Sequence, residues 1–186
     1  MEHFLERVRA FADEAHGTQL RKYSPDRYIV HPVRVMELLA AHRATRAQLA
    51  AALLHDVLED TPVTEGELSH FLHSITAAEE AEAVMQLVVE LTDVYTYEAH
   101  PQWGRKRRKE AEVARMAGVS TAAQTVKYAD IIDNTSEIVR EDPGFAPKFL
   151  KECRALLHEM KAGDAELRAQ ALDVIRAGFD ALQSGR

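Results

Sequence analysis

The stretch AALLHDVLEDTP, residues 51–62, joins an apolar run to a cluster of charged side chains. The apolar run predicts a buried helix, which we expect to cover about 46–60 and to end before Pro62. Acidic residues crowd its last turns, although the helix macrodipole disfavours negative charge there and carboxylates three or four residues apart repel each other. A bound divalent cation would compensate this cluster, and a solvated helix end would tolerate it. The polar residues concerned are His55, Asp56, Glu59 and Asp60.

The rest of the chain has the composition of an all-helical protein. Of its 186 residues, 46% are hydrophobic and only 8 are glycine and 6 proline, so a sizeable core can form with few chain breaks. Apolar residues recur at three-and-four spacing, which predicts helices over about 2–16, 31–41, 46–60, 64–72, 77–92, 105–117, 120–139, 146–161 and 164–182. We therefore expect an all-α bundle of about eight to ten helices. It should form one domain over residues 1–186, with the helices over 146–182 contributing packing.

Three helix ends carry sequence signals of their own. Gly17 follows the first predicted helix and is suited to stop it. Thr64 and Glu67 have the spacing of a capping box at the start of another helix. Ser120 is suited to cap the helix that follows it. These signals place helix ends independently of the apolar periodicity.

Charge and cysteine content argue against several classes of protein. With 23 basic and 30 acidic residues, the net charge is −7, which argues against a DNA- or RNA-binding protein. The single cysteine, Cys153, permits neither a disulfide within the chain nor a cysteine-based zinc site. No apolar run approaches about 18 residues and the N-terminal segment is charged, so neither a membrane span nor a signal peptide is expected. These features favour a cytoplasmic protein and leave its oligomeric state open.

Two more polar residues lie in apolar surroundings far from the first stretch. His31 follows three hydrophobic residues and precedes Pro32, a proline suited to the first turn of a helix. It is either a metal ligand or a histidine that caps or packs against that helix. Asp130 lies inside the largely apolar segment TVKYADIIDNTSEI, residues 125–138, where an unpaired carboxylate is costly to bury. It is either a metal ligand or the partner of a nearby cation such as Lys127.

Together these residues form a candidate metal-binding set. Nitrogen and oxygen ligands without a thiolate suit Mn²⁺, Fe²⁺, Zn²⁺ or Co²⁺, and four protein ligands leave coordination positions for water and substrate. The set is His31, His55, Asp56 and Asp130. Basic residues at 21, 22 and 27 and at 105–109 and 115 suggest a phosphate-bearing substrate, although the second group is also typical of a solvated helix face.

Several spaced elements occur in an order that resembles a known family. They are AHGTQLRKYSPDRYIVHPVRVMELL (15–39), AALLHDVLEDT (51–61), LTD (91–93) and VKYADIIDN (126–134). The chain resembles the (p)ppGpp hydrolase branch of the HD-domain metal-dependent phosphohydrolases, which includes RelA/SpoT-type hydrolase domains and small alarmone hydrolases. The resemblance covers about residues 15–138. It implies a single HD domain and hydrolysis of the 3′-pyrophosphate of guanosine tetra- or pentaphosphate, giving GDP or GTP and pyrophosphate.

The resemblance also implies roles for individual residues. The metal ligands would be His31, His55, Asp56 and Asp130, and the ion in this branch is usually Mn²⁺. Glu59 and Asp60 match the acids that orient or activate the attacking water. Substrate-binding positions would be Arg21 against the guanine base, Lys22 near phosphate, Asn134 on the nucleotide, and Lys127 and Tyr128 along the pocket.

Two segments depart from the family pattern. YSPDR, residues 23–27, stands where relatives usually carry a glycine-containing turn followed by proline, and TDVYTYEAHPQWG, residues 92–104, also differs. Because both are expected to border the substrate, two alternatives stay open. The chain could be an HD-type phosphohydrolase acting on another nucleotide, or a non-catalytic nucleotide-binding module.

Overall fold

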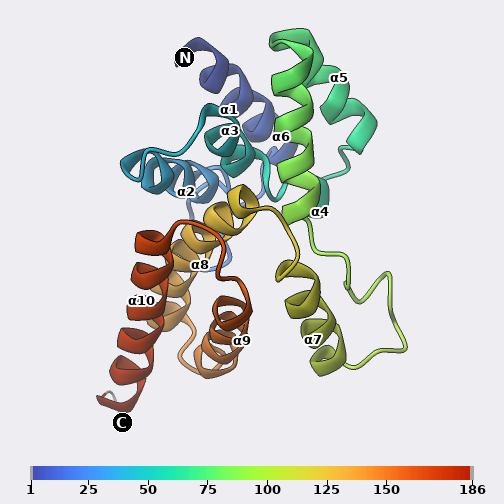
Figure 1. The fold of residues 1–186 in the computed structure, drawn as a ribbon. Coiled ribbons are helices and arrows are strands. Elements are labelled where there is room, and N and C mark those ends of the chain that lie inside the picture. The colour runs from blue at the N-terminus through green and yellow to red at the C-terminus, as the bar shows by residue number, and fades with distance from the viewer. Residues whose placement is uncertain (1, 185–186) are drawn as a thin grey trace. The chain divides into compact units, whose positions relative to one another are not determined.

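The structure is a computed structural model that describes residues 2–184, and ten helices account for most of them (Figure 1). The helices are α1 (Glu2–His16), α2 (Val30–Ala41), α3 (Arg46–Leu54), α4 (Val57–Asp60), α5 (Glu65–Ile75), α6 (Ala78–Leu91), α7 (Arg105–Met116), α8 (Thr121–Glu141), α9 (Ala146–Glu159) and α10 (Ala165–Ser184). In residues 2–184 the extended pairing amounts to an isolated bridge between Leu20 and Arg27. The all-α prediction is confirmed. None of the described helices is both long and apolar enough to cross a membrane.

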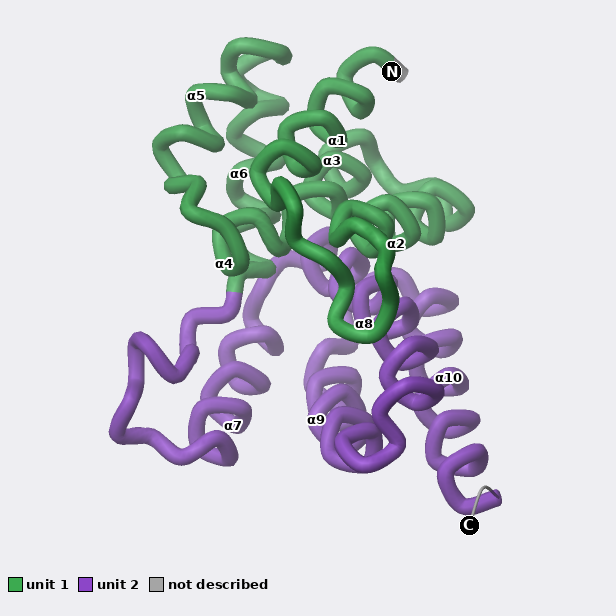
Figure 2. Tube along the Cα trace, turned by 180° about the vertical axis from the view of Figure 1, so that it is seen from behind, with its two compact units in different colours: residues 1–92 green, residues 93–186 purple. Residues whose placement is uncertain are grey.

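The backbone contacts divide the chain into two compact units (Figure 2). Unit 1 comprises residues 1–92 and contains α1 to α6, and unit 2 comprises residues 93–186 and contains α7 to α10. Each unit has its own set of buried apolar side chains. That the whole chain acts as one domain stays a prediction.

Unit 1 is assembled around α3, which packs against α1, α2 and α6. All five residues from Ala50 to Leu54 are at most 1% exposed. Three of them are alanines, whose small side chains let neighbouring helices approach closely. At the start of α3, Thr45 and Gln48 form a capping box. The helix is therefore held on several sides, and its C-terminal end, which leads into His55, is fixed by packing.

The predicted continuous helix over 46–60 is wrong at one point. The structure ends α3 at Leu54 and starts α4 at Val57, so His55 and Asp56 lie at a junction between two short helices. Asp56 has ψ of −5°, away from regular helical values. The His55 ring bonds the carbonyl of Ala52, and Asp56 accepts a hydrogen bond from Tyr28. The second partner is 28 residues away, so the local apolar pattern could not reveal the interruption.

The helix ends predicted from Gly17, Thr64 and Ser120 are confirmed by the structure. Gly17 has φ of +55° and its N–H bonds the carbonyls of Asp13 and Glu14, which closes α1. Thr64 and Glu67 form the expected capping box on α5, and Ser120 caps α8 by accepting from the N–H of Ala123. These interactions lie within a few residues of each other, which is why the sequence alone predicts them.

Unit 1 contains an ion pair whose contribution to stability should depend on pH. Arg46 on α3 bonds the carboxylate of Glu80 on α6, and this bond lowers the pKa of Glu80 below its ordinary value of 4.5. A carboxyl group whose pKa is lower in the folded protein than in the unfolded chain stabilises the fold at pH values above the unfolded pKa. This stabilisation is lost as the pH falls through the folded-state pKa. We expect Glu80→Gln to reduce the free energy of unfolding by about 1 kcal/mol at pH 7, because the pair keeps some solvent access. The difference should vanish below the lowered pKa, as measured by urea unfolding at several pH values. The neighbouring Glu79→Gln serves as the control, and a difference that does not shrink as the pH falls would contradict the assignment.

Unit 2 is built on the long helix α8, which packs against α9 and α10. The chain between α9 and α10 returns onto α8, where the N–H of Asp164 donates to Thr125 Oγ1 at 2.9 Å. Arg168 donates to the carbonyls of Leu157 and Met160, which satisfies acceptors at the C-terminal end of α9. This connection therefore packs against α8 at Thr125.

Gly163 is required by the close approach of that connection to α8. A Cβ atom at this position would lie 2.6 Å from Cε2 of Tyr128 and 2.9 Å from the backbone nitrogen of Thr125. We expect Gly163→Ala to lower the free energy of unfolding by about 1–3 kcal/mol, the usual cost of overpacking. Gly104→Ala is the control, because a Cβ there meets nothing within 4 Å. Equal unfolding midpoints for the two variants in urea would show that the connection can move aside.

Candidate metal centre

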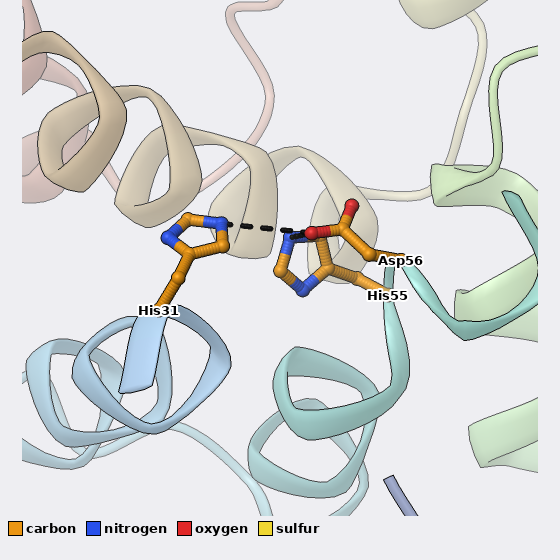
Figure 3. A group of neighbouring side chains, drawn as sticks. All are labelled: His31, His55 and Asp56. Atoms are coloured by element: carbon orange, nitrogen blue, oxygen red, sulfur yellow. Dashed lines mark ion pairs between the residues drawn. The ribbon is translucent and has the colours of Figure 1, made fainter. Parts of the chain in front are cut away.

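His31, His55 and Asp56 converge in unit 1 (Figure 3). Each offers one ligand atom, and these atoms lie within 4.8 Å of one another. His31 comes from the first turn of α2, and the other two come from the junction between α3 and α4. Oδ2 of Asp56 lies 3.7 Å from Nε2 of His31 and 3.1 Å from Nε2 of His55. Both histidine side chains are buried, whereas Asp56 is 20% exposed, so the cluster can be reached from solvent.

The hydrogen bonding of His55 shows that this cluster fits a divalent cation. Its Nδ1 lies 2.7 Å from the carbonyl oxygen of Ala52, which can only accept a hydrogen bond. Nδ1 therefore carries a proton, and Nε2 of the neutral form of this ring would present its lone pair to the Asp56 carboxylate. Two acceptors at this separation need a proton or a cation near both of them. A backbone carbonyl that holds the far nitrogen is the usual support of a metal-ligating histidine.

Tyr28 belongs to the same cluster, although the sequence analysis did not select it. Its hydroxyl donates to Oδ2 of Asp56 at 2.6 Å. Burial, and next the charge of Asp56, raise the pKa of Tyr28 far above its ordinary value, so the hydroxyl keeps its proton. The ring stacks on buried His16, with 4.4 Å between ring centroids. No spacing rule points to either residue, because their contacts link α1, the following loop and the α3–α4 junction.

Glu59 and Asp60 lie on α4, directly after the junction. Partial burial, and next the negative charge of Asp56, raise the pKa of Asp60 above its ordinary value. Tyr28, His16 and His55 act in the opposite direction by stabilising the charged carboxylate. Asp60 is therefore electrostatically coupled to the cluster. Both Glu59 and Asp60 keep enough exposed surface for water to reach them.

The loop that carries Arg21 and Lys22 folds back on itself before α2. The N–H of Arg21 donates to the carbonyl of Asp26 at 2.9 Å, and Arg27 bonds the carboxylate of Asp13 on α1. The departure from the family pattern at 23–27 thus forms a tight turn anchored to α1. The guanidinium of Arg21 lies 5.4 Å from the centroid of the Tyr28 ring, which brings this predicted substrate residue beside the cluster. Lys22 bonds the hydroxyl of Tyr23.

Asp130 lies in unit 2, on α8, and both of its carboxylate oxygens are engaged there. Nζ of Lys127 lies 2.8 Å from Oδ2, and Nδ2 of Asn134 donates to Oδ1 at 2.6 Å. The ion pair is the one anticipated as the alternative to a ligand role. The carboxylate nevertheless lines a cavity of about 180 Å³ rather than the closed core. Polar residues around this cavity include Asp93, Arg105, Lys109, Lys127, Asp130 and Asn134.

Tyr128 is the one predicted substrate residue on α8 that faces the core. It is fully buried, and its hydroxyl donates to the carbonyl of Met160 at 2.8 Å. It also lies against Gly163. The side chain therefore packs α8 against the connection between α9 and α10. It is absent from the lining of the Asp130 cavity.

Comparisons with known proteins identify relatives of this chain. The HD domain family model matches residues 9–156. A probable guanosine-3′,5′-bis(diphosphate) 3′-pyrophosphohydrolase of Mycoplasma pneumoniae is 29% identical over 135 residues, which are 69% of this chain and 17% of that protein. The guanosine-3′,5′-bis(diphosphate) 3′-pyrophosphohydrolase of Vibrio cholerae is 48% identical over 65 residues, 34% of this chain and 9% of that protein. This chain thus spans a small part of the curated relatives it matches.

The fold also matches a solved structure. A metazoan ortholog of SpoT, described as hydrolysing ppGpp, aligns with a TM-score of 0.78 and 22% identity over 94% of each chain. At this identity the likeness concerns the fold. The family model covers most of the chain, and His31, His55 and Asp56 lie together in the structure. The chain belongs to the HD-domain family.

Proposed function

We propose that this protein is a metal-dependent phosphohydrolase that removes the 3′-pyrophosphate of guanosine tetra- or pentaphosphate, giving GDP or GTP and pyrophosphate. The observation that carries the proposal is the close approach of Nε2 of His55 and Oδ2 of Asp56 beside His31, an arrangement that a shared cation would stabilise. The substrate is proposed from the names of the two curated relatives and from the ordered elements that the chain shares with their branch.

The proposed ligands are His31, His55 and Asp56, with Asp130 as the fourth. Mn²⁺ is the proposed ion, because nitrogen and oxygen donors accept it and the resemblance to the (p)ppGpp hydrolases implies it. When bound, the cation would polarise a phosphoryl oxygen of the substrate and make a water molecule more acidic. The protein contributes the fixed orientation of the donors. His55 is held by the Ala52 carbonyl, and Asp56 by the Tyr28 hydroxyl.

Glu59 and Asp60 are proposed to position the attacking water and to accept its proton. Both follow the metal ligands on the short helix α4. The raised pKa of Asp60 makes it a stronger proton acceptor than an ordinary aspartate, which suits a general base. The charges that stabilise its ionised form keep it ready to accept the proton. Because the helix is interrupted at His55 and Asp56, Glu59 and Asp60 belong to a separate short helix, α4.

Basic and amide side chains are proposed to hold the nucleotide. Arg21 has a planar guanidinium that can stack on a base, and Lys22 can neutralise phosphate. In unit 2, Lys127 and Asn134 line the Asp130 cavity. Tyr128 is left out of this set because its hydroxyl is used inside the core.

A Mn²⁺-dependent hydrolysis panel tests the proposal. The substrates are ppGpp, pppGpp, NADPH and simple nucleotides, with identification of the phosphorus product. Release of pyrophosphate from ppGpp is the expected result. Release of orthophosphate from another nucleotide would move the assignment to a different phosphohydrolase. Absence of both turnover and Mn²⁺ uptake would leave a nucleotide-binding module.

A further inference from the structure

The Tyr28 hydroxyl occupies a position that the proposed ligand set does not account for. It donates to Oδ2 of Asp56, the same oxygen that faces the two histidines. It is also near enough to Asp60 to influence that carboxyl group. One phenol therefore acts on a proposed metal ligand and on a proposed water-activating acid.

A hydrogen bond at this oxygen can orient the carboxylate without blocking it. A carboxylate oxygen has two lone pairs, so it can accept from Tyr28 and still offer one pair to a cation. Asp56 is only partly buried and sits at a helix junction whose backbone alone does not define the direction of its side chain. The Tyr28 hydroxyl, at 2.6 Å, supplies that direction.

The Tyr28 ring is itself supported by a stacking contact with His16. His16, at the end of α1, stacks on the ring and is only 6% exposed. Nδ1 of His16 is fixed by Gln19, and its Nε2 is buried without a hydrogen-bond partner. A buried imidazole that leaves one nitrogen unsatisfied is costly, and the geometry shows it serving as a flat support for Tyr28.

We propose that Tyr28 is a positioning residue that orients Asp56 for metal binding, and that His16 supports this role by fixing the plane of the Tyr28 ring. The inference rests on the proposed function only in taking His31, His55 and Asp56 as ligands. It concerns the metal-binding step and does not depend on which nucleotide is hydrolysed.

Mn²⁺ affinity without substrate provides the first test, measured by the electron paramagnetic resonance signal of free Mn²⁺ during titration. We expect Tyr28→Phe to bind Mn²⁺ about 10- to 100-fold more weakly, the usual effect of losing a hydrogen bond to a metal ligand. The ring and its stack on His16 are kept in this variant, and circular dichroism checks its helix content. Tyr97→Phe is the matched control, because Tyr97 is 61% exposed and lies in the other unit.

The outcomes separate this inference from the proposed function. If His55→Ala loses Mn²⁺ while Tyr28→Phe binds it as tightly as the unsubstituted protein, the role of Tyr28 is overturned and the metal site stands. If the unsubstituted protein takes up no Mn²⁺, both the site and the role of Tyr28 are overturned. Weak binding by Tyr28→Phe with normal binding by Tyr97→Phe supports the inference.

A double-mutant cycle tests the part played by His16. We expect His16→Ala to weaken Mn²⁺ binding in the unsubstituted background and to have little further effect in Tyr28→Phe, since residues that act through one another are not additive. His16→Phe, which restores a stacking ring, should recover most of the lost affinity. Full additivity, or failure of the phenylalanine to restore affinity, would contradict support by stacking.

Discussion

Asp130→Ala is expected to lose bound metal and hydrolytic activity together. Asp130 is the proposed fourth ligand, and its carboxylate lines a polar cavity in unit 2. Loss of a ligand should weaken metal binding by more than about 100-fold, because loss of a group that merely supports a ligand already costs about 10- to 100-fold. Elemental analysis after dialysis against Mn²⁺, together with ppGpp hydrolysis, measures both effects. Retention of metal and activity would exclude Asp130 from the site.

Asp130→Ala could also lose metal because it breaks the ion pair with Lys127. A second variant separates this structural effect from the loss of a ligand. Removing Asp130 takes away the carboxylate that lies 2.8 Å from the partly buried Lys127 cation, and this loss alone can destabilise α8. In Lys127→Met/Asp130→Ala, both members of the ion pair are gone. A purely structural role predicts that this double variant regains metal binding, whereas a ligand role predicts that it does not. Asp133→Ala, on the same helix, controls for the loss of an aspartate.

Asp60→Asn is expected to lower kcat by about 10²- to 10⁴-fold, the usual contribution of a general acid or base. The amide keeps the size of the side chain and removes its ability to accept a proton. Because Asp60 is not a proposed ligand, Mn²⁺ affinity should stay within a few-fold of that of the unsubstituted protein. Steady-state kinetics on ppGpp, measured beside a Mn²⁺ titration, give both quantities.

Comparing Asp60→Asn with a variant of Glu59 tests which of the two acids accepts the proton. Glu59→Gln changes the other acid of α4, and the variant with the larger fall in kcat identifies the proton acceptor. Asp173→Asn is the control, since Asp173 is an exposed residue of α10 that pairs with Arg176. A parallel loss of Mn²⁺ affinity and kcat in Asp60→Asn would instead make Asp60 part of the metal site.

Much of the fold follows from interactions between residues close together in the chain. The stop at Gly17, the capping box of Thr64 with Glu67 and the cap at Ser120 each join groups within about one helical turn. Apolar periodicity is similarly local, since it reflects which residues share one face of a helix. These signals were sufficient to predict an all-α protein, most of its helix boundaries and the polar residues that interrupt its apolar segments.

The arrangement of the candidate site depends on contacts that local patterns do not encode. Asp56, which follows the break after Leu54, accepts a hydrogen bond from the Tyr28 hydroxyl, and the Tyr28 ring in turn stacks on His16. Tyr128 shows the converse, because its neighbour Asp130 lines a cavity while Tyr128 itself bonds Met160 in the core.

The sequence by itself therefore determined the helices and which side chains could carry the chemistry. The tertiary structure decided which of them meet. The physical reason is range: helix propensity and capping act over three or four residues, whereas the bond that orients Asp56 joins groups 28 residues apart.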